Sequence, residues 1–174
     1  TVFNDESVQE AFEVKAWVFV SDQFDIGRVT KSILDSITGH GSESADLNVL
    51  QNKLKSELMN KKFLLVLDDV WNEDYHRWQT LRAPFLAGTS DSKIIVTTRN
   101  KKVANIMRAN PVFSLEPLSV NDGWSLFSRH AFEGGNLMCD SRFEDIGRKI
   151  VQKCGCLPLA IKALGGLLGT RCNI

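Results

Sequence analysis

The stretch of residues 61–71 constrains the fold of this chain more than any other. Five consecutive apolar residues, 63–67, follow two lysines and end at two adjacent carboxylates, Asp68 and Asp69. A short apolar run that does not alternate with polar residues is typical of a strand buried on both faces, as in a parallel sheet covered by helices. Ligands bind at the carboxyl ends of the strands in open α/β sheets, which is where the two carboxylates fall. Taken alone, the pattern also fits a strand that simply enters a polar loop.

The composition argues against several classes of protein. The chain of 174 residues has room for one compact domain, or for one domain and a small satellite. Its 21 Lys and Arg residues balance 21 Asp and Glu residues, so no global basic field favours nucleic acid or a membrane surface. No apolar segment has the length needed to span a bilayer. The histidines lack metal-site spacing, and we interpret the cysteines as buried free thiols. The cysteines are Cys139, Cys154, Cys156 and Cys172.

Strand and helix patterns alternate through the first two thirds of the chain. Strands are predicted at residues 14–21, 63–67, 93–99 and 112–115, and the helices between them have Asp25 and Asp46 as N-caps. Residues 1–13 show only loose helical spacing and no capping signal. From residue 117 onward the patterns are helical, and Pro158 stands in the first turn of the last helix. This order predicts an α/β domain with a parallel sheet over residues 1–116, followed by a helical subdomain over 117–174.

Several motifs occur in an order typical of one family. Residues 64–71, Leu-Leu-Val-Leu-Asp-Asp-Val-Trp, look like a Walker B motif, and residues 95–99, Ile-Val-Thr-Thr-Arg, look like a sensor strand. Residues 155–160, Gly-Cys-Leu-Pro-Leu-Ala, are similar to a GLPLA motif. Together they closely resemble the NB-ARC nucleotide-binding domain of plant intracellular immune receptors with leucine-rich repeats. Trp71 is similar to the variant in receptors that lack a Toll-like N-terminal domain. The resemblance spans nearly the whole chain and implies a P-loop NTPase-type sheet flanked by helices.

The resemblance implies a role for five residues. Asp68 would coordinate Mg²⁺, and Asp69 would act as the catalytic residue near an attacking water. Strand geometry is compatible with this division, because successive side chains of a strand point to opposite faces. Arg99 would reach the terminal phosphate and distinguish ATP from ADP, Thr98 would lie at the nucleotide, and Pro158 would pack near the adenine. By position alone, Arg99 is a solvated strand-end residue and Pro158 a helix starter.

The phosphate-binding loop of the family is missing from this sequence. That loop has the pattern G-x-x-x-x-G-K-[ST], and the chain contains no Gly-Lys pair. In the family, the strand before the loop lies between the sensor strand and the strand predicted at 112–115. Without it, the last strand has no sheet neighbour, so we expect the chain alone to be unstable and to bind little nucleotide. Cys156 and Asp91 also stand where the family commonly has glycine.

The function that the resemblance implies is an ADP/ATP-dependent molecular switch in a cytoplasmic immune receptor. ADP would hold the receptor off, and exchange for ATP would shift it toward an active, self-associating state. Its partners would be the adenine nucleotide and the missing N-terminal coiled-coil and C-terminal leucine-rich-repeat domains. Two alternatives stay open. The parent could be an ATPase whose turnover is its function, or the chain could be an incomplete fragment that serves only as an interdomain interaction surface. The switch interpretation itself implies at most slow ATP hydrolysis by the intact parent.

Overall fold

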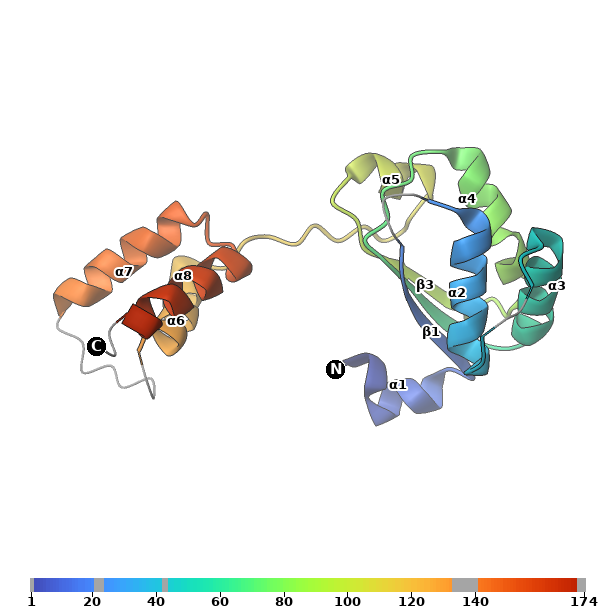
Figure 1. Ribbon diagram of the computed structural model, residues 1–174, viewed down its shortest axis with the longest axis horizontal. Coiled ribbons are helices and arrows are strands. Elements are labelled where there is room, and N and C mark those ends of the chain that lie inside the picture. The colour runs from blue at the N-terminus through green and yellow to red at the C-terminus, as the bar shows by residue number, and fades with distance from the viewer. Residues whose placement is uncertain (1, 21–23, 42–43, 133–140, 172–174) are drawn as a thin grey trace. The chain divides into compact units, whose positions relative to one another are not determined.

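The computed structural model describes residues 2–20, 24–41, 44–132 and 141–171. The chain forms two compact units, Thr1–Val112 and Phe113–Ile174. The first unit contains a parallel sheet of three strands, β1 (Val14–Phe19), β2 (Phe63–Asp68) and β3 (Lys93–Val96), in the order β1-β2-β3 (Figure 1). The strands predicted at residues 14–21, 63–67 and 93–99 are therefore confirmed, although β3 ends at Val96. The end of the predicted first strand, residue 21, lies outside the described residues.

Strand β2 is the central strand, and its register determines which side chains share a face. Phe19 lies opposite Asp68 in the β1–β2 pair, and Leu67 lies opposite Val96 in the β2–β3 pair. Side chains alternate between the two faces of a sheet, so Asp68 shares a face with Phe19, and Leu67 shares the other face with Val96. All five residues of β2 before Asp68 are buried, as the uninterrupted apolar run predicts.

Helices α2 (Ile26–Thr38), α3 (Leu47–Leu58) and α4 (Tyr75–Arg82) follow the strands and begin at capping carboxylates. Asp25, Asp46 and Asp74 each accept hydrogen bonds from backbone N–H groups of the first turn, such as that of Arg28 at 2.7 Å. These bonds satisfy donors that have no partner within a helix. A short 3-10 helix, η2 (Ala83–Ala87), continues α4, and α5 (Lys101–Ile106) follows β3.

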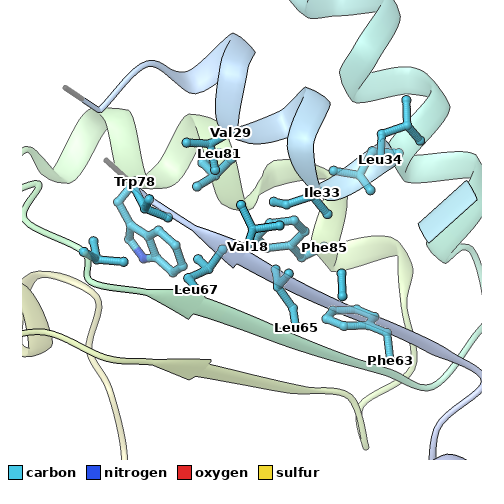
Figure 2. Close-up of a cluster of buried hydrophobic side chains, with 14 of the residues drawn as sticks. Val18, Val29, Ile33, Leu34, Phe63, Leu65, Leu67, Trp78, Leu81 and Phe85 are labelled. Carbon is cyan, nitrogen blue, oxygen red and sulfur yellow. The ribbon is translucent and has the colours of Figure 1, made fainter. Parts of the chain in front are cut away.

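One face of the sheet packs against these helices and forms the core of the first unit. Figure 2 shows Leu65 and Leu67 of β2 pointing toward Ile33, Trp78 and other helical side chains. The opposite face is less covered. Trp17, Phe19 and Ile95 on that face are 49%, 65% and 51% exposed.

The second unit consists of α6 (Val120–Ala131), α7 (Ser141–Lys153) and α8 (Pro158–Arg171). Ser119 caps α6, accepting a hydrogen bond from the N–H of Asp122 and donating one to its carboxylate. The core of the second unit consists of Trp124, Phe127, Ala131, Val151 and Ile161. Cys154 and Cys156 are free thiols, as predicted, but they are half-buried and not buried. Cys139 and Cys172 lie outside the described residues. No helix in the described part of the chain is long and apolar enough to cross a membrane.

Two local predictions are wrong. Residues 112–115 form no strand, and no described segment pairs with them. The backbone N–H and C=O groups of a β-strand form hydrogen bonds with a neighbouring strand. Apolar and β-branched residues therefore do not make a strand where no neighbour is present. Residues before β1 do form a helix, α1 (Glu6–Ala11), because Asp5 accepts a hydrogen bond from the N–H of Ser7 at 3.1 Å. This cap was not predicted.

Candidate functional site

Asp68 is held by the strands on both sides of it. It ends β2 on the less covered face of the sheet, between Trp17 of β1 and Thr97, which follows β3. The hydroxyl of Thr97 donates a hydrogen bond to Asp68 Oδ1, and the indole Nε1–H of Trp17 donates one to Oδ2 at 3.4 Å. Hydrogen bonds to both oxygens orient the carboxylate, as partners of metal-binding carboxylates do.

Asp69 lies beyond the strand and has a left-handed backbone, with φ at 59°. Its N–H donates a hydrogen bond of 2.8 Å to the hydroxyl oxygen of Thr97, so one threonine contacts both aspartates. Because Asp69 lies beyond the end of the strand, the alternation of strand side chains does not explain how the two carboxylates are separated. The left-handed turn separates them, so that Asp68 points to Thr97 and Trp17 whereas Asp69 points to Arg99.

Arg99 makes two side-chain contacts at this edge. Its Nη2 lies 3.4 Å and 3.5 Å from the two carboxylate oxygens of Asp69. Its Cζ lies 4.1 Å from the centre of the Trp71 ring, within the range of a cation–π contact. The Arg99 side chain is 70% exposed, so its ion pair with Asp69 is worth at most about 1 kcal/mol. The guanidinium is thus accessible to a ligand.

Hydrogen bonds to backbone groups join the loops after β2 and β3. The N–H of Val70 donates to Thr97 O at 2.9 Å, and the hydroxyl of Thr98 donates to Val70 O at 2.7 Å. The Thr98 hydroxyl also accepts a bond of 3.1 Å from the N–H of Asn100. The Thr98 hydroxyl therefore links the loop after β2 to the loop after β3. Both of its hydrogen bonds are made to backbone groups of the protein.

The loop after Trp71 is tied to the start of α5. The Asn100 side chain donates a hydrogen bond to Glu73 Oε1, and Lys102 Nζ lies 3.8 Å from Glu73 Oε2. In the same loop, the Asp74 carboxylate accepts hydrogen bonds from the N–H groups of Arg77 and His76. These bonds, chiefly that of Arg77, hold the pKa of Asp74 below its usual value. These hydrogen bonds and the ion pair connect the loop after Trp71 to the start of α5, and the Asp74 cap connects it to the start of α4.

Four of the five predicted residues come together. Asp68, Asp69, Thr98 and Arg99 lie at the carboxyl ends of β2 and β3 in the first unit. Pro158 belongs to the second unit, where it is the first residue of α8. It follows Gly155 and Cys156, which both have positive φ, at 61° and 55°. Cys156 thus adopts a conformation that favours glycine.

Thr97 and Trp17 are not among the residues predicted for the site. Both contact Asp68 from segments on either side of β2. The predicted parallel sheet and the alternation of its side chains carried a signal for them. Once Phe19 and Thr97 are aligned with Asp68, alternation places Trp17 on the same face. That alignment depends on the register of the strands, which the sequence patterns do not specify.

The donor set suits an ion that is shared with phosphates. Within the described residues, no group of three or more His, Cys, Asp or Glu side chains could hold a metal ion. Mg²⁺ in nucleotide sites needs only one or two carboxylates, because phosphates and water supply the other ligands. Asp68 meets that requirement. An open depression of about 520 Å³ lies elsewhere, between α2 and α3, and contains none of the predicted residues.

Comparisons with known proteins show similarity to one family. Residues 1–136 match the NB-ARC domain family. The putative disease resistance RPP13-like protein 1 of Arabidopsis thaliana is 44% identical over 169 residues, which cover 96% of this chain and 16% of the relative. Two Solanum bulbocastanum proteins, the putative disease resistance protein RGA1 and disease resistance protein RGA2, are each 45% identical over 96% of this chain and 17% of their own length. The chain therefore spans about a sixth of the length of these relatives.

Proposed function

We propose, because this chain belongs to the NB-ARC domain family, that it is part of the ADP/ATP-binding switch of an intracellular plant immune receptor. NB-ARC domains bind nucleotides, and the relatives described above carry disease resistance in their names. The observation that carries the proposal is the meeting of Asp68, Asp69 and Arg99 at the carboxyl ends of two adjacent strands. Two carboxylates beside an accessible guanidinium suit a phosphate and its cation.

The two carboxylates have separate roles in this proposal. Asp68, fixed by Thr97 and Trp17, would hold Mg²⁺ directly or through water. When bound, the ion supplies positive charge against the phosphate oxygens. Asp69, turned away by its left-handed backbone, would lie near the attacking water. The left-handed turn supports this division, since it gives the neighbouring carboxylates different surroundings.

Arg99 would distinguish the two nucleotides. Its guanidinium is exposed, and Asp69 holds it at distances longer than the usual 2.7–2.9 Å of a charge-assisted hydrogen bond. A γ-phosphate would compete for these donors, whereas ADP offers no such group. This contact would give ATP and ADP different affinities for the site, and a switch also requires that the nucleotides bind its two states differently.

The remaining roles belong to the wider protein. Thr98 would lie at the nucleotide through its place in the joined loops, and Pro158 would pack near the adenine from the helical subdomain over 117–174. The α/β domain over 1–116 would supply the phosphate end of the site. The phosphate-binding loop, the coiled-coil and the leucine-rich-repeat domain would come from other parts of the receptor, which would act in the cytoplasm and self-associate on activation.

The test is nucleotide binding and turnover by the full-length protein. Titration with ADP and ATP, each with and without Mg²⁺, should show tight ADP binding, and turnover should be slow or absent. Rapid turnover with weak ADP binding would favour an ATPase as the alternative. Binding that is unaffected by the double substitution of Asp68→Ala and Arg99→Ala would contradict the proposed site and favour an interdomain surface as the role of these residues.

A further inference from the structure

We infer that Trp71 is a positioning residue for Arg99, whose guanidinium its indole ring holds at the edge of the sheet. The inference rests on the proposed function, because it explains how Arg99 is kept where a terminal phosphate would reach it. The proposed function itself gives Trp71 no role. The inference therefore adds a residue that sets the preference of the site for ATP over ADP.

The contact of Arg99 with the ring is well formed for its type, whereas its ion pair with Asp69 is long. Arg99 Cζ lies 4.1 Å from the centre of the Trp71 ring, well within the limit of about 6 Å for a cation–π contact. Its Nη2 lies 3.4 Å and 3.5 Å from the oxygens of Asp69, which is long for an ion pair. Asp69 alone would thus hold this exposed, flexible side chain loosely. The stacked ring restricts it further.

The joined loops bring the ring and the guanidinium together. Val70 bonds to Thr97 through its N–H at 2.9 Å and to the Thr98 hydroxyl through its carbonyl at 2.7 Å. Trp71 and Arg99 are the residues that follow these bonded positions. The Nε1 of Trp71 is buried and has no hydrogen-bond partner in the part of the chain that the structure describes. The contact that Trp71 offers Arg99 is therefore made by the face of its ring.

Stacking leaves the hydrogen-bonding edge of Arg99 available. A guanidinium is planar, so it can stack through its face while its N–H groups point outward in the plane. Arg99 can therefore exchange Asp69 for a phosphate without leaving Trp71. Holding the side chain in advance lowers the entropy lost when the phosphate binds, and this gain applies to ATP but not to ADP.

The experiment measures the ratio of ATP affinity to ADP affinity in the full-length protein, by displacement of a fluorescent ADP. Trp71→Leu should lower the ratio by about twofold to fivefold, the size of an exposed cation–π contact. Trp71→Phe should lower it less, because a smaller ring remains and no hydrogen bond of Nε1 is lost. The matched control is Tyr75→Leu, which removes another arginine–aromatic contact of the same unit, to Arg108 at 5.8 Å. It should leave the ratio unchanged.

The Arg99→Ala background separates positioning from a general structural effect. If Trp71 acts through Arg99, then Trp71→Leu should not change the ratio further in that background. An equal fall with and without Arg99, or no fall in the wild-type background, would overturn the inference. If Trp71→Leu also abolishes ADP binding, the comparison of Trp71→Phe with and without Arg99 decides. A wild-type protein that binds neither nucleotide refutes the proposed function and the inference with it. Normal binding with an effect of Arg99→Ala but none of Trp71 refutes the inference alone.

Discussion

The hydroxyl of Thr97, in the loop after β3, donates a hydrogen bond to the carboxylate of Asp68 at the end of β2. The same hydroxyl accepts a hydrogen bond of 2.8 Å from the backbone N–H of Asp69. One side chain thus orients the first carboxylate and supports the left-handed turn that directs the second elsewhere. The geometry of the two aspartates depends on a residue 29 positions away in sequence.

Removal of the Thr97 hydroxyl should weaken Mg²⁺-dependent nucleotide binding by the full-length protein. Thr97→Val keeps the volume but leaves Asp68 and the N–H of Asp69 without this partner. The loss should be about twofold to tenfold in affinity, corresponding to roughly 0.5–1.5 kcal/mol for the hydrogen bond to Asp68. Thr97→Ser should restore most of it. Titration of ADP with and without Mg²⁺ provides the measurement, and equal affinities for wild type and Thr97→Val would contradict the role.

Substitution of the two aspartates should have different effects. Asp68→Ala should weaken Mg²⁺-dependent binding, whereas Asp69→Ala should spare binding and slow hydrolysis. The reason is that Asp68 is fixed between strands while Asp69 turns toward Arg99. The measurements are nucleotide titration and phosphate release by the full-length protein. Equal losses of affinity from both substitutions would count against separate roles.

Arg99→Ala should weaken ATP binding more than ADP binding. A charge-assisted hydrogen bond to a γ-phosphate is worth roughly 1.5–3 kcal/mol, or about tenfold to a hundredfold in relative affinity. Arg99→Lys should recover only part of this, because a point charge does not reproduce the planar fork or its stacking on Trp71. Competitive displacement of fluorescent ADP by each nucleotide gives the ratio. An unchanged ratio would make Arg99 an ordinary strand-end cation.

The 174-residue chain alone should bind ADP and Mg²⁺ weakly or not at all. Backbone N–H groups of a glycine-rich loop supply most phosphate contacts in such sites, and this sequence has no Gly-Lys pair. Titration calorimetry measures the binding, with the full-length protein as the positive control. A sub-micromolar dissociation constant, about −8 kcal/mol or better, would show that the residues of this chain form a site by themselves.

Two glycines of the helical unit should respond oppositely to alanine. A Cβ at Gly147 of α7 would lie 2.0 Å from Trp124 Cζ3, so Gly147→Ala should destabilise the unit by about 1–3 kcal/mol. A Cβ at Gly166 of α8 would meet nothing within 4 Å, so Gly166→Ala should stabilise the helix by up to about 1 kcal/mol. Pulse proteolysis across a urea series measures both in the same protein. A neutral Gly147→Ala would show that Trp124 has room to move.

Local patterns predicted much of the fold because their causes are local. The continuous apolar run of residues 63–67 indicated a strand buried on both faces, and Asp25 and Asp46 indicated helix starts. Each signal depends on residues that are close in the sequence. The same patterns placed Asp68 and Asp69 at the carboxyl end of the central strand, which is the edge where they lie.

Local patterns failed where structure depends on a distant neighbour. The apolar residues 112–115 suggested a strand, but no described strand pairs with them. A β-strand is stabilised by hydrogen bonds to another segment, so its own residues do not suffice. The helix before β1 is an exception to this rule, because its cap at Asp5 is a local signal.

By itself, then, the sequence determined the central strand, the carboxylates at its end and the helices that cover one face. Only the tertiary structure decided what surrounds those carboxylates. Trp17 and Thr97 reach Asp68 from positions 51 and 29 residues away, and Arg99 reaches Asp69 from 30 residues away. The register of parallel strands and the bonds between their loops bring these residues together. Because each contact joins segments separated by a helix or more, it exists only after the sheet has assembled.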